Sequence, residues 1–233
     1  MKTLTPVETQ NLTRKWQRNG KPSISVKKLA EVLAGTNTCL QQFALAVYYE
    51  PPSDRAFDLN GWQAEHQPGV AALADYLQTH YPCEQVQQEV WLPEIALPGG
   101  FLLKGKADVV ACLADGGLIV GDFKTGSWKS ESHWLQCALA ARSLLKAGLG
   151  TYVAGVVRQY LGQEPEVEPD ISKFLGESQI ALMKRVLNVL EVEMVQTTPT
   201  WTNCRFCDFK SACGDAVLEP QVVPVAIDDL LVG

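Results

Sequence analysis

The sequence lacks the features that mark a membrane protein, a secreted protein or a protein that coats nucleic acid nonspecifically. No stretch approaches the ~18 consecutive apolar residues that a membrane-spanning helix needs. The N-terminal stretch MKTLTPVETQNLTRKW has no apolar signal-peptide core. The formal net charge is −6, which is the wrong sign for nonspecific coating of a phosphate backbone. We therefore expect a cytoplasmic protein.

The sequence also lacks the evenly distributed cysteines of a small disulfide-stabilised domain. Of its seven cysteines, three lie close together within residues 204–213. The other four are far apart, at Cys39, Cys83, Cys112 and Cys137. This distribution agrees with a reducing compartment and makes the C-terminal group the first candidate for a metal site.

What is present is enough for a sizeable core. The chain has 233 residues, 46% of them hydrophobic, which suits one large domain or a core with a smaller attached module. Charge is unevenly distributed, because residues 1–28 contain seven Lys or Arg and one Glu. This basic arm either contacts a phosphate backbone or is a solvated tail.

The first part of the chain has helical signals. Residues 23–50 suggest two short helices, the first with Ser25 as its N-cap and Gly35 as its stop. Thr38 can cap the second helix, which would carry Cys39 in its first turn.

Further helices follow, with strands between them. A helix is expected at 68–80, where Pro68 suits the first turn. The patterns predict another helix at 134–148, a strand at 151–161 and an amphipathic helix at 176–196.

Three consecutive segments predict an antiparallel meander. Strand patterns occupy residues 86–97, 101–113 and 118–125, and Gly-rich turns at 98–100 and 115–117 separate them. The element order, helices, three strands, helix, strand, helix, predicts an α/β fold.

The second and third strands of this meander carry charged residues. A three-residue loop at 115–117 would place Asp108 opposite Lys124 and diagonal to Asp122, all on one face. A loop of two or four residues would place Asp108 on the other face. Two carboxylates beside a lysine suit a Mg²⁺ or Mn²⁺ site. The alternative is a structural Asp–Lys ion pair where a buried strand reaches the surface.

The segments GKADVV and VGDFKTG, followed by a helix, resemble the RecB-like branch of the PD-(D/E)XK nucleases. The resemblance covers roughly residues 36–213 and implies a restriction-endonuclease-like core, with a mixed central sheet flanked by helices. It also implies a Mg²⁺ or Mn²⁺ site with Asp108, Asp122 and the Phe123 carbonyl as ligands, and Lys124 as the catalytic lysine.

The same resemblance extends to flanking residues. Gln136 matches the glutamine that this branch carries after the lysine strand, although the usual tyrosine four residues later is Ala140 here. His66 is the candidate for a histidine metal ligand, and Glu89 is a further candidate ligand. The alternatives are a solvated helix residue for Gln136, a surface histidine at a helix start for His66, and a solvent-facing side chain for Glu89.

The cysteine group has metal-ligand spacing. TNCRFCDFKSACG places Cys204, Cys207 and Cys213 as C-x₂-C-x₅-C, and sulfur ligands favour zinc or an iron–sulfur cluster. A fourth ligand is needed. The resemblance to the iron–sulfur members of the branch implies that Cys39 supplies it and that the four cysteines hold a [4Fe–4S] cluster. A zinc site with four cysteines is the alternative.

The predicted organisation has five parts. They are a basic N-terminal arm at 1–28, a helical segment at 29–85, the nuclease core at 86–200, the cysteine-rich segment at 201–216 and a C-terminal tail at 217–233.

The resemblance implies a metal-dependent DNA exonuclease that acts on single-stranded ends in CRISPR adaptation, recombination or repair. Its partners would be DNA and either CRISPR integration proteins or a helicase. A helicase partner would supply unwinding, because the chain lacks the G-x-x-x-x-G-K-[ST] motif of such enzymes. The main alternative is a catalytically weak DNA-binding or assembly subunit. A redox or radical iron–sulfur enzyme is a third, less supported, interpretation.

Overall fold

The computed structural model of the chain describes residues 2–3, 12–15, 20–37, 39–51, 58–126, 128–191, 194–195, 200–205, 207–213 and 216–217. Thr38, much of the basic arm and most of the C-terminal tail lie outside these residues. No helix in the described part of the chain is long and apolar enough to cross a membrane.

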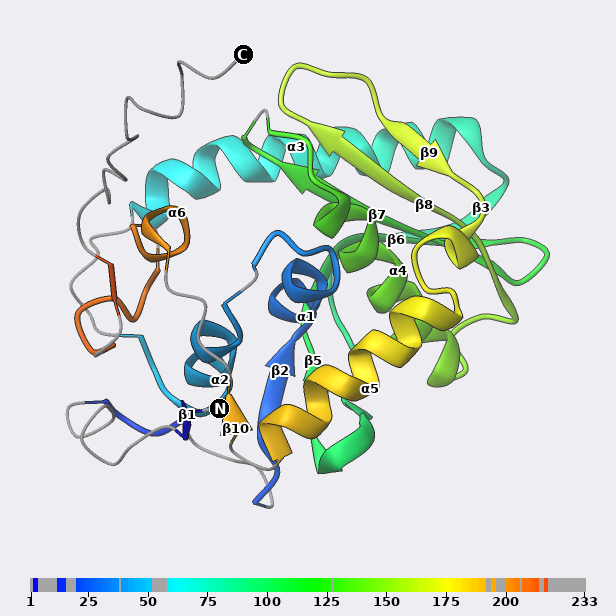
Figure 1. Ribbon diagram of the computed structural model, residues 1–233. Helices are drawn as coiled ribbons and strands as arrows, with labels where there is room; N and C mark the ends of the chain where they lie inside the picture. Colours follow the sequence, from blue (N-terminus) through cyan, green and yellow to red (C-terminus); the bar gives the residue numbers. More distant parts are fainter. Residues whose placement is uncertain are drawn as a thin grey trace, which may run out of the picture.

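A five-stranded sheet in the order β3-β6-β7-β8-β9 forms the centre of the fold (Figure 1). Its strands are β3 (Cys83–Trp91), β6 (Lys106–Leu113), β7 (Gly117–Lys124), β8 (Tyr152–Tyr160) and β9 (Glu166–Glu168). β3, β6 and β7 form the predicted antiparallel meander, whereas β8 runs parallel to β7 and β9 runs antiparallel to β8. The mixed α/β fold is therefore confirmed.

Two small sheets were not predicted. One has the order β2-β5-β4 and consists of β2 (Ser23–Ser25), β5 (Leu102–Lys104) and β4 (Ile95–Ala96); the other pairs β1 (Lys2–Thr3) with β10 (Met194–Val195). The short helix η1 (Pro98–Gly100) joins β4 to β5. The single strand predicted at 101–113 is divided at Gly105. A Cβ at that position would lie 3.1 Å from Val26 Cγ2, so glycine allows this close approach.

The helices lie around the central sheet. They are α1 (Val26–Leu33), α2 (Leu40–Tyr48), α3 (Leu59–His80), α4 (Glu131–Lys146), η2 (Ile171–Lys173), α5 (Glu177–Glu191) and α6 (Trp201–Cys204). In Figure 1 the orange α6, late in the chain, lies on the same side of the molecule as the blue helices α1 and α2. The fold thus brings the two ends of the domain together.

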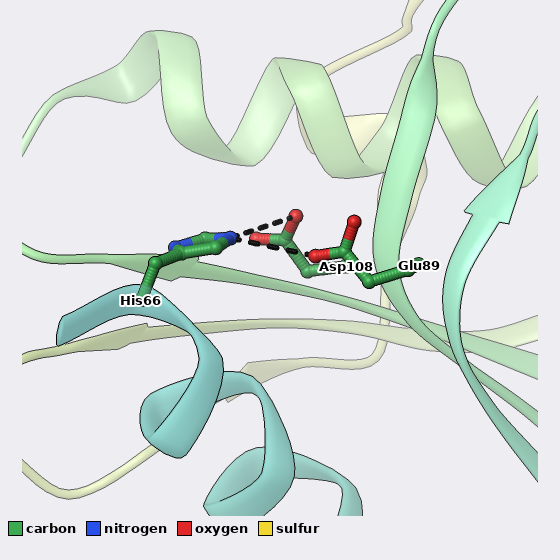
Figure 2. Close-up of side chains that lie close together, drawn as sticks. All are labelled: His66, Glu89 and Asp108. Carbon is green, nitrogen blue, oxygen red and sulfur yellow. Dashed lines mark ion pairs between the residues drawn. The ribbon is translucent and has the colours of Figure 1, made fainter. Parts of the chain in front are cut away.

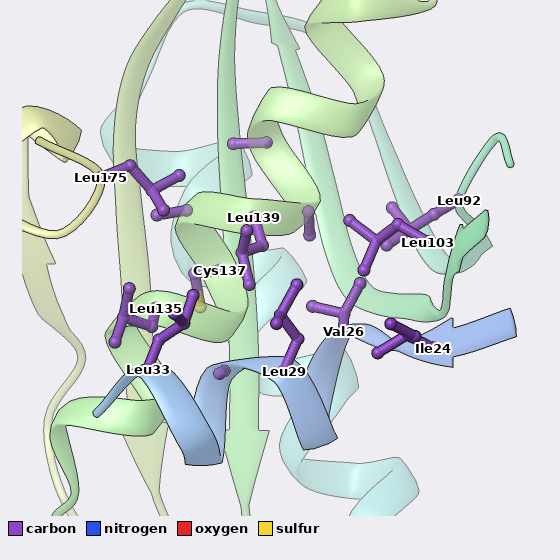
Figure 3. Close-up of a cluster of buried hydrophobic side chains, with 14 of the residues drawn as sticks. Ile24, Val26, Leu29, Leu33, Leu92, Leu103, Leu135, Cys137, Leu139 and Leu175 are labelled. Carbon is purple, nitrogen blue, oxygen red and sulfur yellow. The ribbon is translucent and has the colours of Figure 1, made fainter. Parts of the chain in front are cut away.

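Two apolar clusters fix the layers. On one face of the sheet, α3 buries Val70, Leu73 and Leu77 against strand residues that include Ile119 and Phe123. The other face carries the larger cluster, in which α1, α4 and β2 pack together (Figure 3). Because β7 contributes to both clusters, it is held from two sides and provides a rigid support for its last residues.

Some predicted helix boundaries are confirmed and others are wrong. Ser25 caps α1 by accepting a hydrogen bond from the Lys28 N–H (3.2 Å), and Gly35 has the left-handed conformation (φ 68°) that ends it. Cys39 is the N-cap of α2 rather than part of its first turn. The helix predicted from Pro68 begins at Leu59, so Pro68 lies inside it.

The early start of α3 has a local cause. Asp58 is the N-cap, and its Oδ1 accepts a hydrogen bond from the Gly61 N–H (2.9 Å). The first two turns are almost entirely exposed and carry no apolar stripe. Periodicity therefore does not reveal them, although the capping residue does.

The register of β6 with β7 differs from the prediction by two residues. The turn closes where the Gly116 N–H donates to the Leu113 carbonyl (2.9 Å), and Gly116 has the left-handed conformation (φ 85°). The three-residue loop is therefore 114–116 rather than 115–117, and Cys112 pairs with Leu118. Continuing this register places Asp108 opposite Asp122, not opposite Lys124. The loop length is odd, as predicted.

Candidate active site

The candidate site lies where β6 and β7 part. Their pairing runs only from Cys112–Leu118 to Val109–Gly121, and beyond it the Phe123 N–H donates to Asp108 Oδ2 (2.8 Å). A cleft of about 570 Å³ opens there between α3, α4 and the sheet. Its walls include the predicted site residues His66, Glu89, Asp108, Asp122, Phe123, Lys124 and Gln136.

His66, Glu89 and Asp108 converge from three elements (Figure 2). His66 Nε2 lies 3.6 Å from Glu89 Oε1 and 3.6 Å from Asp108 Oδ1. One ligand atom from each of the three lies within 4.8 Å of the others. His66 is only 5% exposed, so its imidazole is fixed in place. Imidazole and carboxylates at this spacing can surround one divalent ion, whose ligands lie about 2.0–2.6 Å away.

The backbone of Glu89 is strained. Among the described non-glycine residues it alone has a positive φ, of 57°. A bulky side chain in this region costs on the order of 1–3 kcal/mol, and such outliers gather at functional sites. The conformation directs the carboxylate toward His66, and Lys106 forms an ion pair with it. This geometry strengthens the case for Glu89 as a ligand over a solvent-facing role.

Asp122, Lys124 and Gln136 form the second half of the site. Lys124 Nζ donates to Asp122 Oδ1 (2.8 Å) and to Gln136 Oε1 (3.3 Å). Gln136 Nε2 donates to the same Asp122 oxygen (2.8 Å). Gln136 is therefore directed into the site by α4 and is not a solvated helix residue.

The other carboxylate oxygen of Asp122 forms an ion pair but accepts no hydrogen bond from the described residues. Asp122 is 3% exposed, and its Oδ2 lies 2.8 Å from Lys124 Nζ. That contact lacks hydrogen-bond geometry, and within the described residues Oδ2 accepts no hydrogen bond. A buried carboxylate oxygen with spare lone pairs suits a metal ion.

The electrostatics of Asp122 and Lys124 agree with a role for Asp122 as a metal ligand. Burial raises the pKa of Asp122 to about 6, with Lys124 opposing the rise and Asp108 adding to it. Burial alone would lower the pKa of Lys124, but Asp122 and then Asp108 outweigh it and raise that pKa. Lys124 therefore stays protonated at neutral pH, while the two aspartates repel each other. A bound cation would relieve that repulsion.

Packing of its ring against α3 fixes the position of Phe123 at the end of β7. Its ring is buried against α3, where a Cβ on Gly69 would lie only 2.1 Å from Phe123 Cζ. Only glycine at this position lets the ring reach the helix. The predicted role of the Phe123 carbonyl as a metal ligand remains a prediction.

Several cleft residues were missed by the sequence analysis. Trp62 stacks on His66, with ring centroids 4.3 Å apart and an interplanar angle of 19°. The two are four residues apart on α3, a pairing that an earlier helix start would have revealed. His133 Nδ1 lies 2.9 Å from the Tyr160 hydroxyl, and burial, aided by Lys124 and Arg158, lowers the His133 pKa to about 4. Lys27 and Trp128 also line the cleft; the sequence gives no signal for these two.

The four predicted cluster cysteines meet at a separate place. Cys39, at the start of α2, lines a cavity of about 20 Å³ together with Cys204, Cys207 and Cys213. Burial raises the pKa of Cys207 to about 11, against a hydrogen bond from the Phe209 N–H (3.4 Å), and Cys39 and Cys213 add to the rise. The fold thus brings the distant Cys39 beside the C-terminal group, as the prediction required; what the site binds remains a prediction.

The chain resembles known proteins in sequence and in fold. The family model of the PD-(D/E)XK nuclease superfamily matches residues 15–214. A Eubacterium rectale protein that is provisionally called an exonuclease has a similar structure, with a TM-score of 0.51, 13% identity and full coverage of both chains. The crystal structure of SSO0001 has a TM-score of 0.50 and 17% identity, covering 87% of this chain and 90% of that one. At such identities these structures show the fold alone. No curated protein matches the chain.

Proposed function

The chain belongs to the PD-(D/E)XK nuclease superfamily, and on that premise we propose that it is a Mg²⁺- or Mn²⁺-dependent deoxyribonuclease. The preferred substrate is the end of a single DNA strand, which it degrades as an exonuclease. The observation that carries the proposal is the Lys124–Asp122–Gln136 network placed directly beside the His66–Glu89–Asp108 group.

In this proposal most site residues are metal ligands, and Lys124 supplies a positive charge. His66, Asp108, Asp122 and the Phe123 carbonyl would hold the divalent metal, with Glu89 as a further ligand. When bound, such an ion lowers the pKa of a water molecule and neutralises charge on the phosphodiester.

Lys124 has a different role. Because its pKa is raised, it is a proton donor and a fixed positive charge rather than a general base. Its contacts with Asp122 and Gln136 aim Nζ at the cleft, where it can orient the attacking water or stabilise negative charge that develops on the phosphate.

We also propose that Cys39, Cys204, Cys207 and Cys213 hold a [4Fe–4S] cluster, as in the iron–sulfur members of the RecB-like branch. Four sulfurs around one zinc ion at about 2.3 Å lie about 3.8 Å apart. The four cysteines line one cavity, so the same ligands suit zinc as well as a cluster, and metal analysis separates the two. The cluster would join the start of α2 to α6 and the segment after it, and so cross-link the two ends of the domain.

The cellular context is a further proposal. CRISPR adaptation, recombination or repair would each supply DNA ends, with integration proteins or a helicase as partners. The five-part organisation set out from the sequence, from the basic arm to the C-terminal tail, belongs to the same proposal. A catalytically weak assembly subunit is less well supported, because a subunit without chemistry does not need the strained Glu89 or the buried Asp122–Lys124 pair.

The test is a gel assay with end-labelled single-stranded and blunt duplex DNA. Mg²⁺ or Mn²⁺ should support progressive shortening of the single strand. Ca²⁺ should not, because its larger and looser coordination misplaces the reacting groups. Asp108→Ala should be inactive while its circular dichroism spectrum stays native. Cleavage by this variant at the wild-type rate would refute the assignment, and binding without any cleavage by the wild type would favour the assembly subunit.

A further inference from the structure

A second cavity adjoins the cleft of the candidate active site. It has a volume of about 690 Å³, and it shares Lys27, Trp128 and His133 with the cleft. Its far wall includes Asn203 and Arg205 at α6. The two cavities therefore form one groove that leads from the candidate metal site to the segment holding the cysteines.

The wall of the second cavity is polar and slightly cationic. Apart from Trp128 and His133, its uncharged members carry hydroxyl or amide groups, namely Thr36, Asn37, Gln42, Ser132, Thr202 and Asn203. Lys27 and Arg205 are its cations, and Glu31, which forms an ion pair with Lys28 (3.3 Å), is its acid. In a chain of net charge −6, such a wall is a local exception that suits the phosphates and sugars of a nucleic acid.

Trp128 is the unusual residue of this groove. It lies at the junction of the two cavities and is 72% exposed. Trp62, which also lines the cleft, is covered in part by its stacking on His66. An indole exposed to this degree between cationic and polar groups is a poor core residue. It is suited to receive a flat aromatic partner.

Resting on the proposed function, we propose that Trp128 is a base-stacking platform that selects single-stranded DNA. The strand would run from the metal cleft past Lys27 and Trp128 toward Arg205, with one base stacked on the indole. In a duplex each base is already stacked between its neighbours, so its face is not free for the ring. A single strand can turn a base outward at little cost.

The test measures binding without chemistry. Fluorescence anisotropy in chelator would give the Kd of a labelled oligo-dT for the wild type, Trp128→Ala and Trp128→Phe. Loss of one stacked base should weaken binding by about 5- to 150-fold, and the Phe variant should recover most of it. Trp91→Ala is the matched control, because Trp91 is 76% exposed and lies outside both cavities.

Single abasic sites moved along the oligonucleotide add a second readout. At one position near the cleaved end, an abasic site should weaken binding by the wild type but cause no further loss in Trp128→Ala. The inference is overturned if Trp128→Ala binds like Trp91→Ala, if blunt duplex loses as much affinity as the single strand, or if the abasic effect persists in Trp128→Ala. Because no step needs metal, absence of cleavage would count against the proposed function and not against the platform.

Discussion

Asp122→Asn should change the pH dependence of stability in the metal-free protein. Burial raises the pKa of Asp122 to about 6 in the folded state, whereas its ordinary value is 3.8. A raised carboxyl pKa adds stability that is complete below the unfolded value and is lost as pH rises through the folded value. The gap of about two units corresponds to about 3 kcal/mol, of which about 2 kcal/mol is lost between pH 4.5 and 7.5.

Asparagine keeps the shape of the side chain and an oxygen for the hydrogen bonds from Lys124 and Gln136, but it does not titrate. At pH 4.5 the wild-type carboxyl is mostly protonated and resembles the amide, whereas at pH 7.5 it is ionised; the attraction of Lys124 is already contained in the pKa of about 6. The free energy of unfolding of Asp122→Asn minus that of the wild type should therefore rise by about 2 kcal/mol from pH 4.5 to 7.5.

Urea unfolding followed by circular dichroism in metal-free buffer at the two pH values measures this difference. Asp75→Asn, an exposed aspartate on α3, is the control and should follow the wild type. Mn²⁺ at neutral pH should stabilise the wild type and leave Asp122→Asn nearly unchanged. Parallel pH profiles for the wild type and Asp122→Asn would refute the view that a buried, ionised Asp122 destabilises the empty site.

Three further changes test other parts of the structure. Lys124→Ala should abolish cleavage but retain metal-induced stabilisation, seen in a thermal melt; a lost melt shift would make Lys124 structural. Cys39→Ala should lose the visible absorbance and iron of anaerobically purified protein, while Cys112→Ala keeps both; one zinc per chain and no iron would disprove the cluster. Gly69→Ala should destabilise the fold by about 1–3 kcal/mol, because its Cβ displaces the Phe123 ring; an unchanged urea midpoint would contradict that contact.

The sequence predicts the features that depend on local pattern. The meander, the crossing helix after β7 and the Ser25 cap follow from periodicity and capping residues. The odd-length turn put Asp108 and Asp122 side by side, because turn length controls which face a residue occupies. The predicted position of the loop, 115–117, was wrong by one residue, because Gly116 and Gly117 are alike in sequence. Their contacts are alike too, because a Cβ on Gly116 would lie 2.9 Å from Thr151 Oγ1 and one on Gly117 would lie 2.8 Å from the Tyr152 ring.

Features that depend on contacts between residues distant in sequence could not be predicted from the sequence. The pairing of β2 with β5 joins residues almost eighty positions apart and involves three residues on each side. Short strands of this kind have no periodic signature. Trp128 was missed for the same reason: its place in the cleft depends on how α1 and the loop before α4 meet.

The long helix α3 fixes the position of His66 relative to the core. Its later turns are anchored by Val70, Leu73 and Leu77, and its earlier turns project outward with His66 near the boundary. One residue inserted between His66 and Val70 would turn the imidazole by about 100° and move it by about 1.5 Å, while the core remained intact. Even an insertion of a whole turn would move it by about 5 Å. Related chains that keep this histidine are therefore expected to align without gaps across that turn.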